Sequence, residues 1–392
     1  MKILFVIDEY DDTLNSTTVA ARQLADELKR RGHVISFLST GEEKPNKIIL
    51  ESRKAPLLAK KYLKTNHITL AKPDIRSMRR AIRGQDVVHF FYPFKLSREG
   101  LEIANEMGVA TTASFVVQPE NVTQNLGFGN SKMVNNMTYS KFAKFYNDIS
   151  HISCLSENIK SLLEEHNYTS NVHVIPNGVT NSYHYRRIEK PERFQERIVI
   201  TMTGNFSKEK DQETLIKAVK LSKYSKYIHL ILAGEGVEQE KYEAELNKLH
   251  LQYTMNHYPE NDLREILSYT DIYVHSTLLE QETINCLEAI ALGNVPIIIN
   301  NSEGMAMRYA LDERSLYDKD NSQELADKID YWIEHQTELN NMRNKYAKVA
   351  DKYRISDEAT LYEKMFAESI KDHLKSSYLE SVHQTNTMNN DQ

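Results

Sequence analysis

Two glutamates lie eight residues apart in "LLEQETINCLEAIALG" (278–293), and a third glutamate lies between them. They are Glu280, Glu288 and, in the middle, Glu282. Carboxylates accept hydrogen bonds from hydroxyl groups, so a sugar and a ribose are natural ligands for such a pair. The alternative is that acidic residues near the N-terminus of a helix simply stabilise that helix. Glu288 fits this alternative less well, because the apolar sequence AIAL follows it directly.

A phosphate site is the second chemical feature that the sequence suggests. The apolar pattern predicts a helix that begins near Ile284 or Asn285, and the amides and dipole at its N-terminus favour an anion such as a diphosphate. In "TGNFSKEK" (203–210), Gly204 would let the backbone approach a ligand closely, and Lys210 would add a positive charge. An ordinary glycine turn with a surface lysine explains the same residues.

The elements that must position these residues are alternating strands and helices. Continuous apolar runs predict strands in the first half of the chain at 2–8, 33–39, 86–93, 109–117, 151–156 and 171–179. Helical patterns lie between several of them, as in 18–32, and the alternation restarts near residue 196. We therefore predict an α/β protein with two doubly wound, Rossmann-like parallel-sheet domains facing a central cleft. Ligands of such sheets bind at the carboxyl ends of the strands.

The predicted boundaries follow from the same pattern. We expect an N-terminal domain over 1–180 and a second domain over 181–357, with a hinge at 177–185. The last residues, 378–392, are polar and are predicted to be disordered.

Composition narrows the class of protein. The chain has 392 residues, 40% hydrophobic and 27% charged, with a net charge of −6, which argues against a general nucleic-acid binder. Its two cysteines, Cys154 and Cys286, fit a reducing cytoplasm. The apolar run at the start is too short for a signal peptide, and no stretch approaches the roughly 18 apolar residues of a membrane span. No cluster of histidines and cysteines suggests zinc, and the acidic stretch at 318–320 is interpreted as helix capping by Asp320 or Asn321.

Positive charge is concentrated in one window. Residues 44–83 hold twelve lysines and arginines against two acidic residues, a net charge of +10. Apolar residues are interleaved at helical spacing, Leu58 with Tyr62 and Ile75 with Met78. Such a surface can bind an anionic membrane face. Two ordinary helices with solvated lysines explain the window equally well, and the two interpretations are compatible.

The order of these motifs resembles that of the retaining family 4 glycosyltransferases. The resemblance covers roughly residues 1–370 and rests on "VIPNGV" (174–179), "GNFSKEKDQETLI" (204–216), "GEG", and Glu280 and Glu288 followed by "AIALG". It implies the GT-B fold, a nucleotide-sugar donor that is usually a UDP- or GDP-sugar, and no cofactor or metal. The helix at 358–374 would cross back to the first domain.

The resemblance also assigns roles to single residues. Lys210 would contact the donor diphosphate and Glu280 the donor sugar, and these two are the expected catalytic residues. Glu288 would hold the ribose. The remaining donor-side positions are Gly204, Asn205, Glu282, Thr283, Ile284, Asn285, His257 and Tyr258, the last two in a loop (256–263) that packs on the base.

Several positions depart from the family pattern. Asn205 stands where an arginine is usual, and Asn15 and Ser16 stand where glycines are common. An active-site histidine is replaced by Val116 or Val117. With Gln118, residues Asn15, Ser16 and His89 form the expected acceptor side, although His89 is also explained as a satisfied structural histidine.

The expected function is transfer of a hexose, with retention, to a membrane lipid or lipid-linked saccharide at the cytoplasmic membrane face. The alternatives are a GT-B partner subunit with weak or no catalysis, or an enzyme that acts on a small soluble metabolite. The sequence does not decide whether the protein forms homo- or hetero-oligomers.

Overall fold

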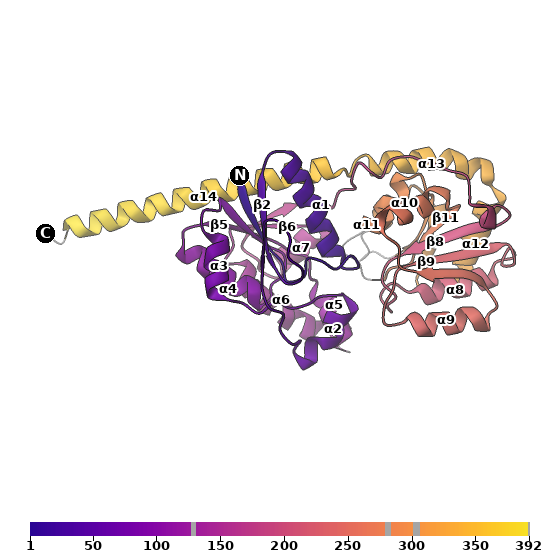
Figure 1. Ribbon diagram of the computed structural model, residues 1–392, viewed down its shortest axis with the longest axis horizontal. Helices are drawn as coiled ribbons and strands as arrows, with labels where there is room; N and C mark the ends of the chain where they lie inside the picture. The colour runs from indigo at the N-terminus through magenta and orange to yellow at the C-terminus, as the bar shows by residue number, and fades with distance from the viewer. Residues whose placement is uncertain (127–130, 279–283, 301–305, 391–392) are drawn as a thin grey trace. The chain divides into compact units, whose positions relative to one another are not determined.

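The computed structural model describes residues 1–126, 131–278, 284–300 and 306–390. The chain divides into two compact units, each built of helices around a parallel sheet (Figure 1). Unit 1 comprises Met1–Pro176 and Ser356–Gln392, and unit 2 comprises Asn177–Ile355. The predicted α/β class with two Rossmann-like sheets is confirmed.

Unit 1 contains a parallel sheet of seven strands within the described residues, in the order β3-β2-β1-β4-β5-β6-β7. The strands are β1 (Lys2–Val6), β2 (Val34–Ser39), β3 (Lys47–Ile49), β4 (Val87–Phe90), β5 (Ala110–Ser114), β6 (His151–Cys154) and β7 (Asn171–Val174). The helices are α1 (Ser16–Arg30), α2 (Lys60–Thr65), α3 (Ile75–Ile82), α4 (Lys95–Glu106), α5 (Pro119–Asn125), α6 (Lys132–Tyr146), α7 (Glu157–Glu165) and α14 (Ile355–Asn390). The chain order reverses between β1 and β4, which is the ligand-binding switch point of such a sheet.

Side chains of β4 show how the two faces of this sheet are covered. The His89 ring lies 5.5 Å from the rings of Tyr362 and Phe366, both on α14. The next residue, Phe90, points to the other face, where its ring lies 6.0 Å from Phe145 of α6. Because successive strand residues alternate between faces, helices from distant parts of the chain cover the sheet on both sides.

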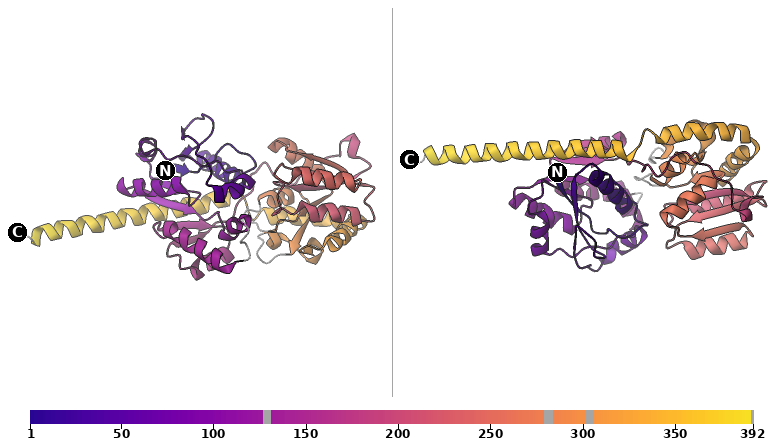
Figure 2. Two further views of the ribbon diagram at one scale, coloured as in Figure 1. Left: turned by 90° about the horizontal axis from the view of Figure 1, so that it is seen from below. Right: turned by 45° about the horizontal axis from the view of Figure 1, so that its top comes forward.

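Helix α14 belongs to unit 1 although it ends the chain. Ala359, Tyr362, Phe366 and Ser369 are buried at helical spacing, and the Arg31 guanidinium donates to Glu363 at 2.8 Å. The backbone is helical as far as Asn390, and its last part extends past the body of unit 1 (Figure 2). The prediction of a disordered tail over 378–392 is therefore wrong for its described part. No glycine or proline interrupts the segment, so nothing local ends the helix.

Unit 2 repeats the architecture. Its six strands in the described residues have the order β10-β9-β8-β11-β12-β13 and are all parallel. They are β8 (Ile198–Thr203), β9 (Ile228–Ala233), β10 (Gln252–Asn256), β11 (Ile272–His275), β12 (Pro296–Asn300) and β13 (Leu316–Asp318). The helices are α8 (Gln212–Leu221), α9 (Gln239–Lys248), α10 (Glu260–Tyr269), α11 (Ile284–Ala291), α12 (Ser322–Glu334) and α13 (Gln336–Ala350). The switch point here lies between β8 and β11.

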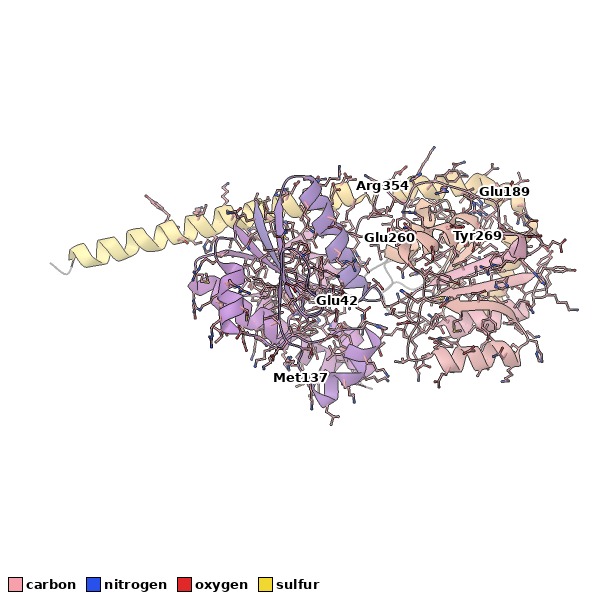
Figure 3. The ribbon with its side chains drawn as sticks, in the orientation of Figure 1. Glu42, Met137, Glu189, Glu260, Tyr269 and Arg354 are labelled. Atoms are coloured by element: carbon pink, nitrogen blue, oxygen red, sulfur yellow. The ribbon has the colours of Figure 1, made fainter. Side chains whose placement is uncertain are left out.

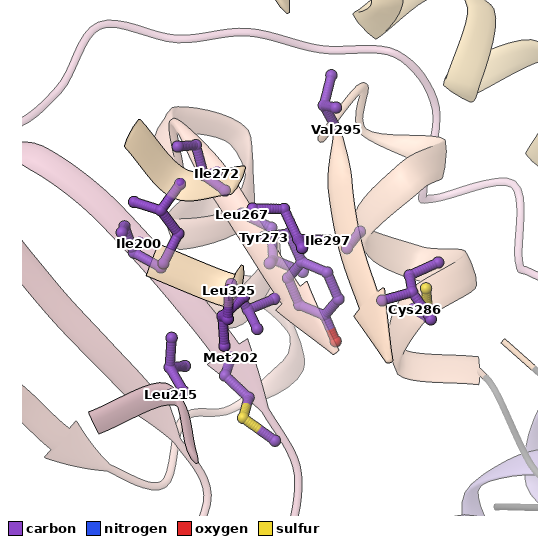
Figure 4. Close-up of a cluster of buried hydrophobic side chains, with 14 of the residues drawn as sticks. Ile200, Met202, Leu215, Leu267, Ile272, Tyr273, Cys286, Val295, Ile297 and Leu325 are labelled. Atoms are coloured by element: carbon purple, nitrogen blue, oxygen red, sulfur yellow. The ribbon is translucent and has the colours of Figure 1, made fainter. Parts of the chain in front are cut away.

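The core of unit 2 fixes the elements that carry the expected donor residues. Met202 of β8, Leu215 of α8, Cys286 of α11 and Leu325 of α12 are almost fully buried in one cluster (Figure 4). Removing a side chain of this kind typically costs about 2–5 kcal/mol, so the strand ends and the start of α11 are held firmly.

Several elements differ from the sequence-based expectation. The strands β3, β10 and β13 were missed because they are short or partly polar, and all three are edge strands of their sheets. Ile75, expected to pack with Met78, is 60% exposed. The helix start near Ile284 is confirmed, as is capping by Asn321, whose side chain accepts from the Glu324 amide.

Candidate functional site

The loop that follows β8 begins with a glycine in a conformation that disfavours other residues. Gly204 has φ +131°, and its amide donates to the carbonyl of Ala233 at 3.0 Å. A second glycine lies against it, because a Cβ atom on Gly234 would lie 2.1 Å from the Gly204 carbonyl oxygen. The short "GEG" motif therefore has a steric role, which is to let the loops after β8 and β9 approach each other.

The side chains of Lys210 and Asn285 both approach the backbone of Gly204. A Cβ atom on Gly204 would lie 3.4 Å from Cε of Lys210 and 3.5 Å from Nδ2 of Asn285. The lysine comes from the loop after β8, whereas the asparagine lies in the first turn of α11. An ammonium group and an amide donor thus converge at the switch point of unit 2, next to the start of a helix. This combination suits an anion.

Hydrogen bonds from the end of β11 hold the loop that carries Lys210. The Ser276 hydroxyl donates to the carbonyl oxygens of Lys210 and Asp211, at 2.8 and 3.0 Å. The Leu278 amide donates to the Glu209 carbonyl at 2.8 Å. The sequence analysis did not single out Ser276, since a serine after a strand is common and its partners lie about 65 residues away.

A hydrogen bond between Asn205 and Gln212 joins the beginning of this loop to the first residue of α8. The Gln212 side-chain amide donates to the Asn205 carbonyl at 2.9 Å, and Gln212 itself is buried. Asn205 is partly exposed beside Gly204. Asn205 therefore occupies the position at which the family usually has an arginine, but its side chain carries no charge.

Glu288 is buried one turn inside α11, with 6% of its surface exposed. The Tyr183 side chain lies near this carboxylate, and the pKa of Tyr183 is raised, first by burial and then by the negative charge of Glu288. The Arg264 guanidinium lies 6.0 Å from the centre of the Tyr183 ring. Tyr183 was missed, because nothing in the local sequence connects it with a residue more than one hundred positions away.

The residues expected near the base follow β10. His257 and Tyr258 are both partly buried. Tyr258 packs against the apolar cluster of Phe194 and Tyr269, and burial raises its pKa. The Gly234 amide donates to the carbonyl of Asn256 at 2.9 Å, so this loop starts beside the glycines that follow β8 and β9.

Three predicted residues, Glu280, Glu282 and Thr283, lie outside the described residues. Ile284 is the first residue of α11 and is buried. The assignments of Glu280 to the donor sugar and of Thr283 to a backbone contact therefore stay predictions.

Two of the four expected acceptor-side residues of unit 1, Asn15 and His89, are buried and hydrogen-bonded within the unit. Asn15 is buried and caps α1, since its Oδ1 accepts from the Thr18 amide at 2.7 Å. Its Nδ2 donates to the Asn66 carbonyl at 2.7 Å. Ser16 is the exposed first residue of α1, and Gln118 is partly buried just before α5. A capping asparagine explains the departure from glycine at position 15.

His89 has no exposed surface. Its two ring nitrogens lie 2.9 Å from the hydroxyl oxygens of Thr112 and Ser114, and burial lowers its pKa to about 3. The side chain faces α14 inside unit 1, so the predicted contact with an acceptor is wrong. The structural interpretation of this histidine is the correct one.

The basic window lies on the surface of unit 1, and part of its charge is paired. Lys44 and Lys47 both bind the Asp11 carboxylate. Partial burial acts to raise the pKa of Asp11, but the hydrogen bonds from the two lysines and from an amide outweigh it and lower this pKa to about 2. Other cations of the window are exposed: Lys54, Lys60, Lys61, Lys64, Lys72, Arg76, Arg79, Arg80 and Arg83. No helix among the described residues is long and apolar enough to cross a bilayer.

Two Rossmann-like units, each with its own parallel sheet, are the architecture of the GT-B fold. Alr3699/HepE from Anabaena, solved with UDP and glucose, has this fold. It is 13% identical, with a TM-score of 0.73 over 94% of this chain and 100% of that chain.

Family models match both units. Residues 17–182 match the model described as Glycosyltransferase Family 4, and residues 186–350 match Glycosyl transferases group 1. The chain belongs to glycosyltransferase family 4. An alpha-monoglucosyldiacylglycerol synthase from Streptococcus pneumoniae is 21% identical over 327 residues, which are 77% of this chain and 71% of that protein. The catalytic domain of a cholesterol-alpha-glucosyltransferase from Helicobacter pylori is 43% identical, covering 40% of this chain and 98% of that one, with a TM-score of 0.39.

Proposed function

We propose that this protein is a retaining glycosyltransferase that moves a hexose from a UDP-sugar to a membrane lipid or a lipid-linked saccharide. The observation that carries the proposal is that the side chains of Lys210 and Asn285 both approach the backbone of Gly204. The alpha-monoglucosyldiacylglycerol synthase supports a lipid acceptor by its name, and the Anabaena protein, solved with UDP and glucose, supports the donor.

The reaction places a leaving diphosphate at this loop. An acceptor hydroxyl would attack the anomeric carbon on the face from which the diphosphate departs. The bond from that carbon to the acceptor oxygen forms as its bond to the phosphate oxygen breaks, and the proton passes to the diphosphate. The Lys210 ammonium and the amide of Asn285 would stabilise the negative charge that develops there. No metal ion is needed in this scheme.

Glu288 is suited to binding the ribose of the donor. Its carboxylate is buried inside α11, so little side-chain entropy is left to lose on binding. A carboxylate offers several lone pairs to ribose hydroxyls.

A basic surface with apolar tips supports a membrane-bound acceptor. Leu57, in the short helix η1 (Leu57–Ala59) that runs into α2, is 87% exposed next to the exposed lysines of α2. On α6, Met133 and Met137 are 74% and 63% exposed, and Met137 lies on the surface of unit 1 (Figure 3). Both methionines line a shallow depression together with Lys141 and Lys144. Helix α2 packs on α5, and α5 on α6, so these groups belong to one side of unit 1. Exposed apolar side chains among lysines are suited to binding the surface of an anionic bilayer on the cytoplasmic side.

Turnover tests the enzyme proposal. The assay is release of UDP or GDP from a panel of nucleotide-sugars, with and without bacterial lipid extract, by the native protein, Lys210→Ala and Lys208→Ala. Lys208 is an exposed lysine of the same loop and serves as the matched control. We expect lipid-stimulated release that falls by about 10²-fold or more in Lys210→Ala only, as for the loss of one stabilising donor.

A non-catalytic partner subunit is the second candidate. It is favoured by Asn205, which brings no charge where the family has arginine, and by Asn15, whose side chain is used in capping. Absence of release from any donor, in a protein shown to be folded, would select this candidate and reject the enzyme.

Co-sedimentation with vesicles tests the membrane surface separately. Vesicles that contain an anionic phospholipid should bind the protein at low salt and release it at high salt, because screening weakens the lysine contribution. Leu57→Asp should reduce binding, whereas Leu311→Asp, which changes an exposed leucine of unit 2, should not. Equal binding by both variants, or none by the native protein, would favour an acceptor that is soluble.

A further inference from the structure

A group of metal-ligating side chains lies in unit 1, where α14 crosses the last two strands of the sheet. His151 begins β6 and His173 lies on β7, and Glu368 faces them from α14. One nitrogen or oxygen atom from each of the three lies within 4.8 Å of the others. The three residues are far apart in the sequence and meet only because α14 returns to this sheet.

The two histidines are already oriented as a pair. Nδ1 of His151 lies 3.0 Å from Nε2 of His173, so one of these nitrogens carries the proton and the other accepts it. On its other side, Nε2 of His151 lies 3.1 Å from the Asp372 carboxylate. That carboxylate holds the proton on Nε2 and leaves the lone pair of Nδ1 directed at His173. A carboxylate behind a histidine is the usual outer shell of a metal-ligating histidine.

The surroundings allow an ion to enter. The His151 side chain is 4% exposed and that of His173 20%, whereas the Glu368 side chain is 41% exposed. One Glu368 oxygen lies 3.8 Å from Nε2 of His173, and the other lies 3.9 Å from the Lys364 ammonium. The histidine side of the cluster is thus mostly buried and its carboxylate side faces solvent.

We propose that His151 Nδ1, His173 Nε2 and Glu368 form a binding site for a divalent transition metal, with zinc as the best match. Two nitrogens bound to one tetrahedral zinc at about 2.0–2.1 Å lie about 3.3 Å apart, so the two nitrogens need to separate by a few tenths of an ångström while the rings turn to aim both lone pairs at the ion. The proton on Nε2 of His173 moves to Nδ1 of the same ring, and water completes the coordination.

The consequence of binding is a cross-link between α14 and the end of the sheet. Tyr362 and Phe366 anchor the helix on β4, and the Ser369 hydroxyl donates to the Thr111 carbonyl at 3.0 Å. Glu368 lies on the neighbouring side of the helix, facing β6 and β7. A metal ion there would attach α14 to β6 and β7 as well as to β4 and β5, and would slow the local opening of this helix.

The experiment uses the full, untagged chain after chelator treatment, titrated with Co²⁺ as a visible probe and then with Zn²⁺. We expect one equivalent of Co²⁺ to give the absorption of a tetrahedral site, and Zn²⁺ to displace it. Zn²⁺ should also slow amide exchange in the α14 segment around Glu368. These effects do not depend on glycosyl transfer, so they stand or fall separately from the proposed function.

Variants decide whether the named residues bind the metal. Glu368→Gln keeps the shape of the side chain and should lower the Co²⁺ affinity by at least about tenfold, and Asp372→Asn should lower it by about 10–100-fold. The control is Asp357→Asn, which changes a carboxylate of the same helix outside the cluster and should bind Co²⁺ as the native protein does. Absence of saturable Co²⁺ absorption, or unchanged affinity in folded Glu368→Gln, would mean that the histidines form only a hydrogen-bonded pair.

Discussion

Replacement of Asp8 by asparagine should make the stability of unit 1 less dependent on pH. Asp8 follows β1 and has no exposed surface. Its Oδ1 accepts from the Ala71 amide at 2.9 Å, whereas its Oδ2 is buried without a hydrogen-bond partner among the described residues. Burial raises the pKa of this carboxyl from 3.8 to about 7, against the lowering effects of the Ala71 amide and of Arg53.

The sign and size of the effect follow from proton linkage. Because the folded state holds its proton more tightly than the unfolded chain, the stabilisation is complete below pH 3.8 and is lost as the pH rises through about 7. At 1.36 kcal/mol for each pKa unit, the whole effect is about 4 kcal/mol, and more than half of it is lost between about pH 5 and pH 8. An asparagine side chain does not titrate. The stability of Asp8→Asn relative to that of the native protein should therefore be greater at pH 8 than at pH 5 by that amount.

Hydrogen exchange of the β1 amides is the suitable assay, since the single tryptophan, Trp332, lies in unit 2 and does not report on unit 1. Opening free energies are compared for the native protein, Asp8→Asn and the control Asp26→Asn, whose carboxylate is exposed. Comparing the two pH values cancels any constant cost of burying the amide. If the opening free energies of Asp8→Asn and the native protein differ by the same amount at both pH values, the reasoning is refuted. That result would show that the Asp8 carboxyl does not titrate in this range.

Two further predictions concern unit 2. Gly234→Ala should destabilise this unit by about 1–3 kcal/mol or more, because its Cβ would meet the Gly204 backbone, and denaturant unfolding followed by Trp332 fluorescence measures the loss. Alanine is strained by the positive φ at both glycines, but in Gly204→Ala it meets only side-chain atoms. Gly204→Ala should therefore cost less stability while weakening UDP binding, and equal stability losses would contradict this. Glu288→Gln should weaken UDP binding by about tenfold, measured by calorimetry, because a charge-assisted hydrogen bond to the ribose is lost. The exposed Glu243→Gln is the control, and equal affinity of the two variants would remove Glu288 from the site.

The fold was predictable because its signals are local. Continuous apolar runs gave the central strands, and the apolar pattern after residue 283 placed the start of α11 correctly. The edge strand β3 (Lys47–Ile49) was missed because only three residues form it and it lies in the basic window. Helix α14 runs beyond the predicted end, since a polar composition without glycine or proline does not stop a helix.

The site was only partly predictable, since its contacts join distant parts of the chain. Gly204 and Lys210 are close in sequence and were identified, but the approach of Asn285 depends on the order of β8 and β11 in the sheet. The partnership of Tyr183 with Glu288 has no local signal. For His89 the sequence left an acceptor contact and a structural role open, because the α14 side chains that pack against it lie more than 260 residues later.

The contact of Lys210 with the donor diphosphate is tested most directly by comparing the affinities of UDP and uridine. The native protein should bind UDP more tightly than uridine. Lys210→Ala should lower UDP affinity by about tenfold to a hundredfold, the value of a charge-assisted hydrogen bond, and leave uridine affinity unchanged. Lys208→Ala should change neither. An unchanged preference for UDP in Lys210→Ala, or an equal loss in Lys208→Ala, would contradict the assignment of the phosphate site to Gly204, Lys210 and Asn285.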